Sequence, residues 1–231
     1  MLTRLATILI ASTTLLIPTL ACAGASNDGS HRDGGNSTNV LNGQITFGAQ
    51  WSTVNTTAHN VGGDVVVQSQ GAGNVLSLTT FNNTNVDSTQ EADSTNIGST
   101  VNAGVSNVYG SVSIQGTAVC NSTDVSTDPA YTVVKSNQIC NAQDPGSEVN
   151  AHVANVGGDV SIASSAFGNN YTEDTNALSA PTTLHQVNTS QVFGTANATI
   201  RNVGGSVQVT GSAIGNNAQI VHYTDNGQPV Q

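Results

Sequence analysis

Apolar and polar residues alternate in four stretches of the chain that align with one another without a gap. The last stretch, residues 202–216, reads NVGGSVQVTGSAIGN and aligns with residues 60–74, 107–121 and 155–169. The asparagines that begin these stretches stand 47, 48 and 47 residues apart. A period of this size at nearly constant spacing is typical of stacked or solenoidal repeat proteins.

The alternation within each copy predicts a β-strand with one buried face. In the third copy Val156, Val160 and Ile162 share one parity, and smaller residues follow on the same face. Period two is the strand period. The two glycines after Val156 indicate a bend or bulge, because glycine tolerates backbone angles that β-branched residues avoid. The Gly-Asn pair that closes three of the four copies predicts a turn.

The repeat as a whole predicts an all-β domain, and we favour a parallel β-solenoid of four repeats over a sandwich. We expect each repeat to supply about three short strands and the four motif strands to stack in equivalent positions. The first asparagines of the copies would then form a ladder of stacked side-chain amides. We take eight residues as the structural repeat positions: Asn60, Asn107, Asn155, Asn202, Gly63, Gly110, Gly158 and Gly205.

The first residues have the features of a secretory signal peptide. Arg4 precedes an apolar run over residues 5–20, and Ala21, Cys22 and Ala23 form a small-x-small cleavage site, so we predict that residues 1–23 are removed. A transmembrane helix is disfavoured because the run is shorter than the roughly 20 residues needed to span a bilayer. Lipidation of Cys22 stays open as an alternative. We expect no membrane-spanning segment in the mature protein.

The start of the folded domain follows from a change in composition. Residues 24–42 are rich in Gly, Ser and Asn without apolar periodicity, which predicts a flexible leader. Beyond Gln44 the residues Ile45, Phe47, Ala49 and Trp51 alternate with polar ones. We therefore place the β-repeat domain at residues 43–231.

The charge balance narrows the classes of partner. The chain has 4 Lys and Arg against 14 Asp and Glu, so removal of Arg4 leaves a net charge of 3 − 14 = −11. Such an acidic protein is a poor ligand for nucleic acid or for an anionic membrane surface. Because only 8% of all residues are charged, we expect the exposed faces to be neutral hydrogen-bonding ladders.

No group of residues predicts a catalytic or metal site, and we expect neither enzyme activity nor a cofactor. Asp64 and Asp159 share a repeat position, where a polar corner is favoured over a calcium site because serines fill it in the other copies. Carboxylate pairs such as Glu91 with Asp93 keep a glycosidase open as an alternative, as do Glu173 with Asp174. The five histidines share no repeat position and have no i, i+4 pairing: His31, His59, His152, His185 and His222.

Two cysteines remain after loss of the signal peptide. Cys120 and Cys140 form an even pair in an exported chain, which predicts a disulfide. Cys120 replaces a glycine of the other copies on the face expected to point inward. We expect the bond to fix residues 122–149 as a loop against the second repeat, contributing on the order of 3 kcal/mol.

An alternating strand followed by Ala-x-Gly-Asn-Asn and a second polar strand resembles secreted repeat proteins of bacterial surfaces. Residues 166–173 (AFGNNYTE) and 213–220 (AIGNNAQI) carry this resemblance. It is strongest to the holdfast-anchoring proteins of stalked bacteria, which are themselves similar to curlin fibre subunits. Curlin repeats place glutamines at fixed steps beside the Gly-Asn turn, a frame that we do not find here. The resemblance implies an exported, outer-membrane-associated protein that helps to hold an adhesive polysaccharide on the cell envelope.

We therefore predict a non-enzymatic secreted surface protein that contributes to adhesion, fibre formation or holdfast anchoring. Exposed strand edges are templates for pairing with another copy or a related subunit, and extracellular polysaccharide is a further candidate partner. A carbohydrate-active β-helix enzyme and a polysaccharide-binding module stay open as alternatives. An ice- or surface-binding solenoid would need a Thr-x-Thr ladder at one repeat position, and threonines such as Thr79 and Thr80 do not recur that way.

Overall fold

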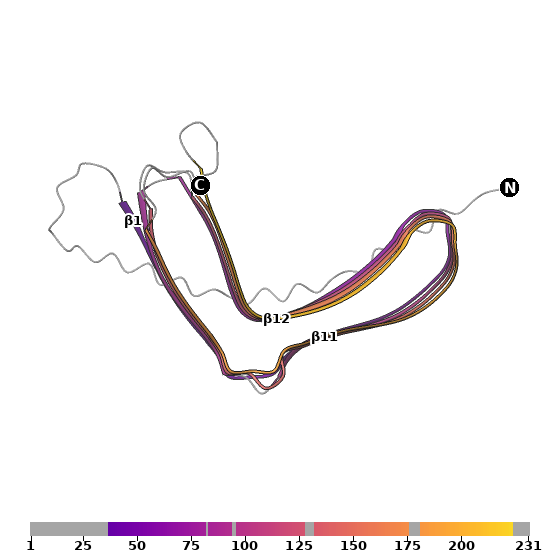
Figure 1. Ribbon diagram of the computed structural model, residues 1–231, viewed down its shortest axis with the longest axis horizontal. Helices are drawn as coiled ribbons and strands as arrows, with labels where there is room; N and C mark the ends of the chain where they lie inside the picture. The colour runs from indigo at the N-terminus through magenta and orange to yellow at the C-terminus, as the bar shows by residue number, and fades with distance from the viewer. Residues whose placement is uncertain (1–36, 82, 94–95, 128–131, 176–180, 224–231) are drawn as a thin grey trace.

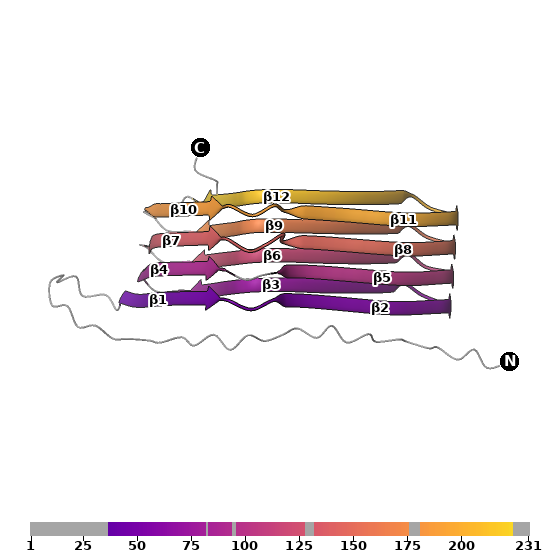
Figure 2. The same cartoon turned by 90° about the horizontal axis from the view of Figure 1, so that it is seen from below.

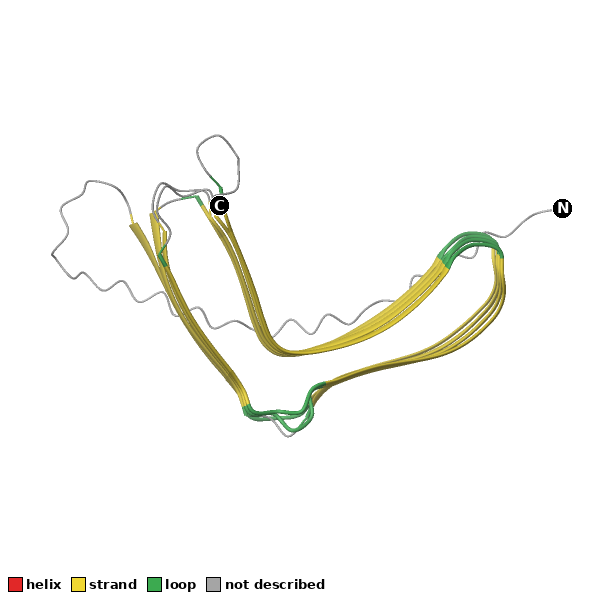
Figure 3. Cartoon of the chain, in the orientation of Figure 1, coloured by secondary structure: helices red, strands yellow, loops and turns green. Residues whose placement is uncertain are grey.

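The computed structural model describes residues 37–81, 83–93, 96–127, 132–175 and 181–223. These residues form strands and connecting bends, and no helix is present among them (Figure 3). The predicted signal peptide, Cys22 and His31 lie outside the described residues. The strands are β1 (Ser37–Thr46), β2 (Gln50–Val61), β3 (Val65–Thr80), β4 (Asn83–Ala92), β5 (Ile97–Val108), β6 (Val112–Thr127), β7 (Thr132–Cys140), β8 (Gly146–Val156), β9 (Val160–Thr175), β10 (Thr182–Asn188), β11 (Phe193–Val203) and β12 (Val207–His222).

The strands form three parallel four-stranded sheets, with orders β1-β4-β7-β10, β2-β5-β8-β11 and β3-β6-β9-β12. Three consecutive strands make one coil, and each repeat makes one coil, numbered here 1 to 4 in chain order. Figure 2 shows the coils stacked in that order. The register places Asn55 opposite Asn102 and Val112 opposite Val160, so equivalent residues of successive repeats are neighbours. The predicted parallel β-solenoid is confirmed, with strands of 7 to 16 residues that exceed the short ones expected.

Each coil has a bent cross-section with two arms (Figure 1). One arm encloses the larger apolar core, formed by stacked valines and isoleucines such as Val101, Val149, Ile114 and Ile162. Smaller apolar clusters fill the bend and the other arm. The valines of the motif that were expected to point inward do so in coils 1 to 3, where Val67, Ile114 and Ile162 are at most 1% exposed.

The first strand corrects the predicted start of the domain. β1 begins at Ser37, so regular structure starts within the segment predicted as a flexible leader and before the proposed boundary at Gly43. The apolar residues that suggested the boundary point outward, because Ile45 and Phe47 are exposed while Gln44 and Thr46 face inward. Polar residues line the inside of this strand, so the apolar alternation did not mark where the ordered domain begins.

Asparagine rather than glycine makes the corner between the second and third strands of each coil. Asn60, Asn107, Asn155 and Asn202 have φ of 55°, 56°, 57° and 53°, a left-handed conformation that asparagine adopts more readily than most residues. The glycines that follow do not need a left-handed φ. Gly158 is required for another reason, because a Cβ there would lie 2.9 Å from the backbone of Gly110 in the preceding coil.

The Gly-Asn pairs mark a bend inside a strand, and the prediction of a turn there is wrong. β9 runs without a break through Gly168 and Asn169, and both residues are buried. Two adjacent buried residues shift the alternation by one position, so the inward-facing residues before Gly168 and after Asn169 have opposite parity. The bend lies where the two arms of the coil meet (Figure 1).

The structure contains a disulfide between Cys120 and Cys140, with 5.8 Å between their Cα atoms. Cys120 lies in β6 and Cys140 ends β7, so the bond joins the third strand of coil 2 to the first strand of coil 3. The spacer between them is therefore not the loop that we expected. Apart from residues 141–145, the described residues of the predicted loop belong to β6, β7 and β8.

Candidate functional site

The asparagines at the corners form the amide ladder that the repeat predicts. Asn107 donates from Nδ2 to Oδ1 of Asn60 at 2.9 Å, and the same bond joins Asn155 to Asn107 and Asn202 to Asn155, also at 2.9 Å. All donors point toward coil 1. The ladder gives the stack a direction as well as a fixed register.

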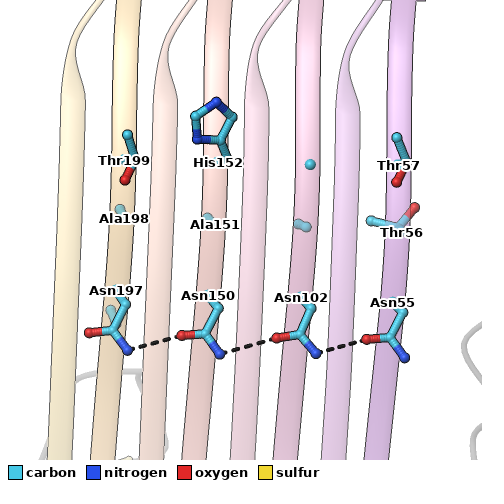
Figure 4. Close-up of a pocket in the computed structure, with 13 residues that line it drawn as sticks. Asn55, Thr56, Thr57, Asn102, Asn150, Ala151, His152, Asn197, Ala198 and Thr199 are labelled. Carbon is cyan, nitrogen blue, oxygen red and sulfur yellow. Dashed lines mark hydrogen bonds between the residues drawn. The ribbon is translucent and has the colours of Figure 1, made fainter.

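A second exposed ladder lies on the outer face of the β2-β5-β8-β11 sheet (Figure 4). Asn102, Asn150 and Asn197 each donate to the asparagine of the preceding coil, ending at Asn55, with distances of 2.7, 3.1 and 3.0 Å. Each of these asparagines stands five residues before the first asparagine of a motif copy. The same side-chain amide is therefore presented at every coil along a straight line.

This second ladder borders a shallow groove of about 890 Å³ that crosses all four coils. Its floor is made of small residues, including the buried Ala103 and Ala151. The third row of the lining has Thr57, Gly104, His152 and Thr199, so the row has no side chain at Gly104. We call this surface the asparagine groove, defined by the Asn55, Asn102, Asn150 and Asn197 ladder and the two residues that follow each of them.

The asparagine groove is almost free of charge. Glu148 reaches its border, where its Oε1 accepts a 2.9 Å hydrogen bond from Asn150. His152 is exposed in the lining. The remaining lining consists of amides, hydroxyls, methyl groups and backbone, a composition that binds neutral polar molecules by hydrogen bonds.

Glutamines form a further ladder that the sequence did not lead us to expect. Gln90, Gln138 and Gln186 each donate to the glutamine of the preceding coil, ending at Gln44, at 2.9, 3.0 and 2.8 Å. They stand 46, 48 and 48 residues apart, outside the four motif copies, and that spacing was the available signal. These glutamines lie on the first strand of each coil rather than on both sides of the Gly-Asn pairs, so the ladder differs from the glutamine frame of curlin repeats.

The asparagines at the bends form an inner ladder of opposite polarity. Asn74 donates to Asn121, Asn121 to Asn169 and Asn169 to Asn216, each at 2.8 Å. Three of these side chains are buried. The inner ladder satisfies amides that would otherwise be costly to bury.

Glu173 and Asp174, one of the two carboxylate pairs considered for a glycosidase, do not face a common cleft. Glu173 is fully buried and accepts hydrogen bonds from the Tyr171 hydroxyl at 2.6 Å and from Thr182 Oγ1 at 2.8 Å. His222 Nε2 lies 3.3 Å from the same carboxylate. Burial, together with the hydrogen bond and charge of Glu173, raises the pKa of Tyr171. Asp174 is exposed, so this group is a buried polar network within the stack.

The corner aspartates bind backbone amides. Ser111 N donates to Asp64 Oδ1 at 2.7 Å, Asp159 N to Ser111 Oγ at 3.2 Å, and Ser206 N to Asp159 Oδ1 at 2.7 Å. Aspartate and serine thus alternate from coil to coil, and no two carboxylates are stacked there. Among the described residues no group of three or more His, Cys, Asp or Glu side chains is placed to hold a metal ion.

The remaining histidines belong to separate surfaces. His59 Nδ1 contacts Ser106 Oγ, and His185 Nδ1 lies 2.9 Å from Asn137 Oδ1.

In the part of the chain that the structure describes, no helix is long and apolar enough to cross a membrane.

Comparison with known proteins agrees with the resemblance to holdfast-anchoring proteins. No curated protein and no solved structure matches the chain. A family model described as holdfast attachment protein D matches residues 18–220, which include all four coils except the last two residues of β12. Such proteins act at the cell surface or envelope. The chain therefore belongs to the holdfast attachment protein D family.

Proposed function

We propose that the mature protein is exported, has no catalytic activity, and anchors the holdfast to the cell envelope by binding its polysaccharide along the asparagine groove. Family membership supports a role in holdfast attachment. The proposal that the asparagine groove binds polysaccharide rests on the line of four exposed asparagines across the stack.

The geometry of the asparagine groove suits a neutral sugar chain. Successive coils are spaced by about 4.8 Å, the separation of neighbouring strands, which is comparable to the length of one sugar unit. Within the ladder the two central asparagines each use one N–H and one oxygen lone pair, whereas Asn55 only accepts and Asn197 only donates. The second N–H of Asn150 is bonded to Glu148, so every ladder amide can still accept a hydrogen bond and all but Asn150 can still donate one. One polysaccharide strand laid across the coils thus meets the same amide at each step.

The low charge of the groove supports the same class of ligand. Sugar hydroxyls donate and accept hydrogen bonds as amides do, whereas a polyanionic ligand would need the arginines and lysines that this chain lacks. The described part of the chain has Lys135 and Arg201 as its only cationic residues of these types, and neither lines the groove. Weak bonds repeated along a polymer add to a firm attachment.

Two variants test this function in different ways. Asn102→Ala combined with Asn150→Ala removes the central amides, and Gly104→Leu fills the groove without changing the ladder, because a Cβ at Gly104 has only Thr57 Oγ1 nearby, at 3.9 Å. We expect each variant to weaken binding of purified holdfast polysaccharide by roughly tenfold. Cells that carry either variant should shed holdfast into the medium.

Gln115→Ala provides the matched control. Gln115 is an exposed amide that pairs with Gln68 at 3.3 Å on the β3-β6-β9-β12 sheet, away from the groove. This variant should bind polysaccharide like the unaltered protein. Unchanged binding in both groove variants, with unaltered circular dichroism, would contradict the proposal.

A further inference from the structure

The two ends of the stack are unlike each other, and coil 4 leaves part of its apolar face uncovered. In coils 1 to 3 the third strand packs on the second strand of the following coil, as β3 on β5, β6 on β8 and β9 on β11. β12 has no such strand among the described residues. Val207 and Val209 are consequently 50% and 44% exposed, whereas the equivalent Val160 and Ile162 of coil 3 are 1% and 0% exposed.

Coil 1 offers the strand that β12 lacks. Its second strand, β2, aligns in register with the second strands of the other coils and presents Val54 and Val61, which are only partly buried against the main core. Placed above coil 4, β2 of a second copy would occupy the position that β5 has above β3. Val54 would then cover the exposed valines of β12.

The ladders end with complementary groups. At coil 4, the exposed ladders end on the Oδ1 atoms of Asn202 and Asn197, because every donor in these ladders points toward coil 1. At coil 1 the same ladders end on the Nδ2 groups of Asn60 and Asn55. Both ladders therefore continue without reversal if coil 1 of a second copy follows coil 4.

The alternation of aspartate and serine at the corners also favours coil 1 of a second copy next to coil 4. Asp64, Ser111, Asp159 and Ser206 alternate along the stack, and a following coil 1 would place the next aspartate on Ser206. Its backbone N–H would donate to Ser206 Oγ as Asp159 N does to Ser111 Oγ. A contact between two coil 1 ends would reverse the strand direction and would not continue this alternation.

Contacts within one copy do not explain why residue 63 is a glycine, as Gly63 is. At Gly110, Gly158 and Gly205 a Cβ would lie within 3 Å of atoms of the preceding coil, but at Gly63 a Cβ would meet nothing within 4 Å. Gly63 also does not adopt a left-handed φ. A preceding coil 4 supplied by a second copy would make Gly63 as necessary as its equivalents.

From these observations we propose that coil 4 of one copy binds coil 1 of a second copy, so that the chain assembles head to tail into a continuous solenoid. The contact is heterologous and open-ended, and it therefore produces filaments rather than closed dimers. It requires no glycan and goes beyond the proposed attachment function. A symmetric contact between two coil 4 ends would not continue the ladders.

The test uses the mature full-length chain with each end blocked separately. Gly63→Leu places a side chain in the space below coil 1, and Val209→Lys places a charge on the exposed inner face of β12. Either change should shift the concentration of half-assembly by more than about tenfold, because overpacking or a buried charge acts only at the contact. Sedimentation velocity and negative-stain microscopy measure assembly.

Mixing the two blocked chains determines the sense of the contact. Gly63→Leu keeps a free coil 4 and Val209→Lys keeps a free coil 1, so an equimolar mixture should form heterodimers and nothing larger. Gly43→Leu is the matched control, since a Cβ at Gly43 also meets nothing within 4 Å but equivalent positions bear the larger Thr89, Asn137 and His185. This control should assemble normally.

Three results would overturn the proposal. Unaltered protein that stays monomeric at every concentration would show that something other than a second copy, such as a related subunit or the chain's own ends, covers coil 4. Dimers formed by Gly63→Leu alone would show a symmetric contact. A mixture of folded blocked chains without heterodimers would exclude head-to-tail binding.

Discussion

Asn107 donates its side-chain amide to Oδ1 of Asn60 at 2.9 Å while both residues hold a left-handed backbone, with φ of 56° and 55°. One residue type thus does two tasks at each corner: it tolerates the backbone conformation and it fixes the next coil in register. Glycine would meet only the first requirement, and most other residues would meet neither.

Two substitutions at Asn107 separate these tasks. Asn107→Gly keeps the backbone conformation but loses the ladder bonds to Asn60 and Asn155, each worth about 0.5–1.5 kcal/mol. Asn107→Ala loses the same bonds and adds the cost of a left-handed alanine, about 1–2 kcal/mol. Urea unfolding should show that alanine destabilises more than glycine. Equal effects would mean that backbone conformation does not limit the choice of residue.

The disulfide should be a major contributor to stability. Cys120→Ala with Cys140→Ala is expected to lower the free energy of unfolding by about 3 kcal/mol, since a crosslink over 20 residues restricts the unfolded chain. Chemical denaturation with and without reductant measures the effect. Reductant should destabilise the unaltered protein to a similar degree and leave the double variant unchanged, and equal stability of the two oxidised proteins would contradict this.

Tyr171 should make the protein sensitive to alkaline conditions. Burial first, and then Glu173, raise the pKa of its hydroxyl, so the folded protein keeps a proton that the unfolded chain releases above about pH 10. The stabilisation is complete below that pH and is lost as the pH rises further, by up to about 1.4 kcal/mol per pH unit. Tyr171→Phe should reduce this slope, as measured by urea unfolding at about pH 8 and about pH 11.

A matched control for the alkaline effect is Tyr109, which is exposed. Tyr109→Phe should leave the slope of stability against pH unchanged. Absorbance titration provides an independent readout, because Tyr171 should ionise only as the protein unfolds. Ionisation of Tyr171 in the folded protein near pH 10 would contradict the role assigned to its burial.

The glutamine ladder on the first strands of the coils should tolerate substitution poorly. Gln138 is fully buried and donates to Gln90 Oε1 and Asn170 O, each at 3.0 Å. Gln138→Leu leaves these buried acceptors with fewer partners, and we expect a loss of about 1–3 kcal/mol in thermal and urea unfolding. The exposed Gln115→Leu should stay within about 0.5 kcal/mol of the unaltered protein. Similar stabilities of the two variants would show that the ladder has no structural role.

The solenoid was predictable because the motif copies align without a gap. In a stack of parallel strands, equal spacing places equal residues side by side, and Asn60 and Asn107 therefore pair as expected. The glutamine ladder was harder to foresee, since Gln44 and Gln90 lie in spacers with otherwise different sequences and a spacing of 46 residues. The strand alternation was also clear, but it does not say which face is inside when, as in β1, polar residues face inward.

The asparagine groove needed the three-dimensional structure. Asn102, Asn150 and Asn197 share a recognisable pattern, yet its outward direction and the depth of the groove depend on the small residues beside it in each coil. The corner conformation also escaped prediction, because glycine is the usual residue at positive φ and two glycines stand next to the asparagine. Their true role, close approach between coils, involves residues one full repeat apart.

The Cys120–Cys140 bond has a mechanical consequence for the proposed role in anchoring the holdfast. When a chain is pulled apart, each released residue adds about 3.3–3.6 Å of length. The 20-residue separation of the cysteines means that the closed segment cannot extend, which removes roughly 70 Å from the length that a torn solenoid can release. When the chain is pulled, the residues between the two cysteines therefore stay unextended at this covalent junction between coils 2 and 3. The protein would lengthen less before it fails.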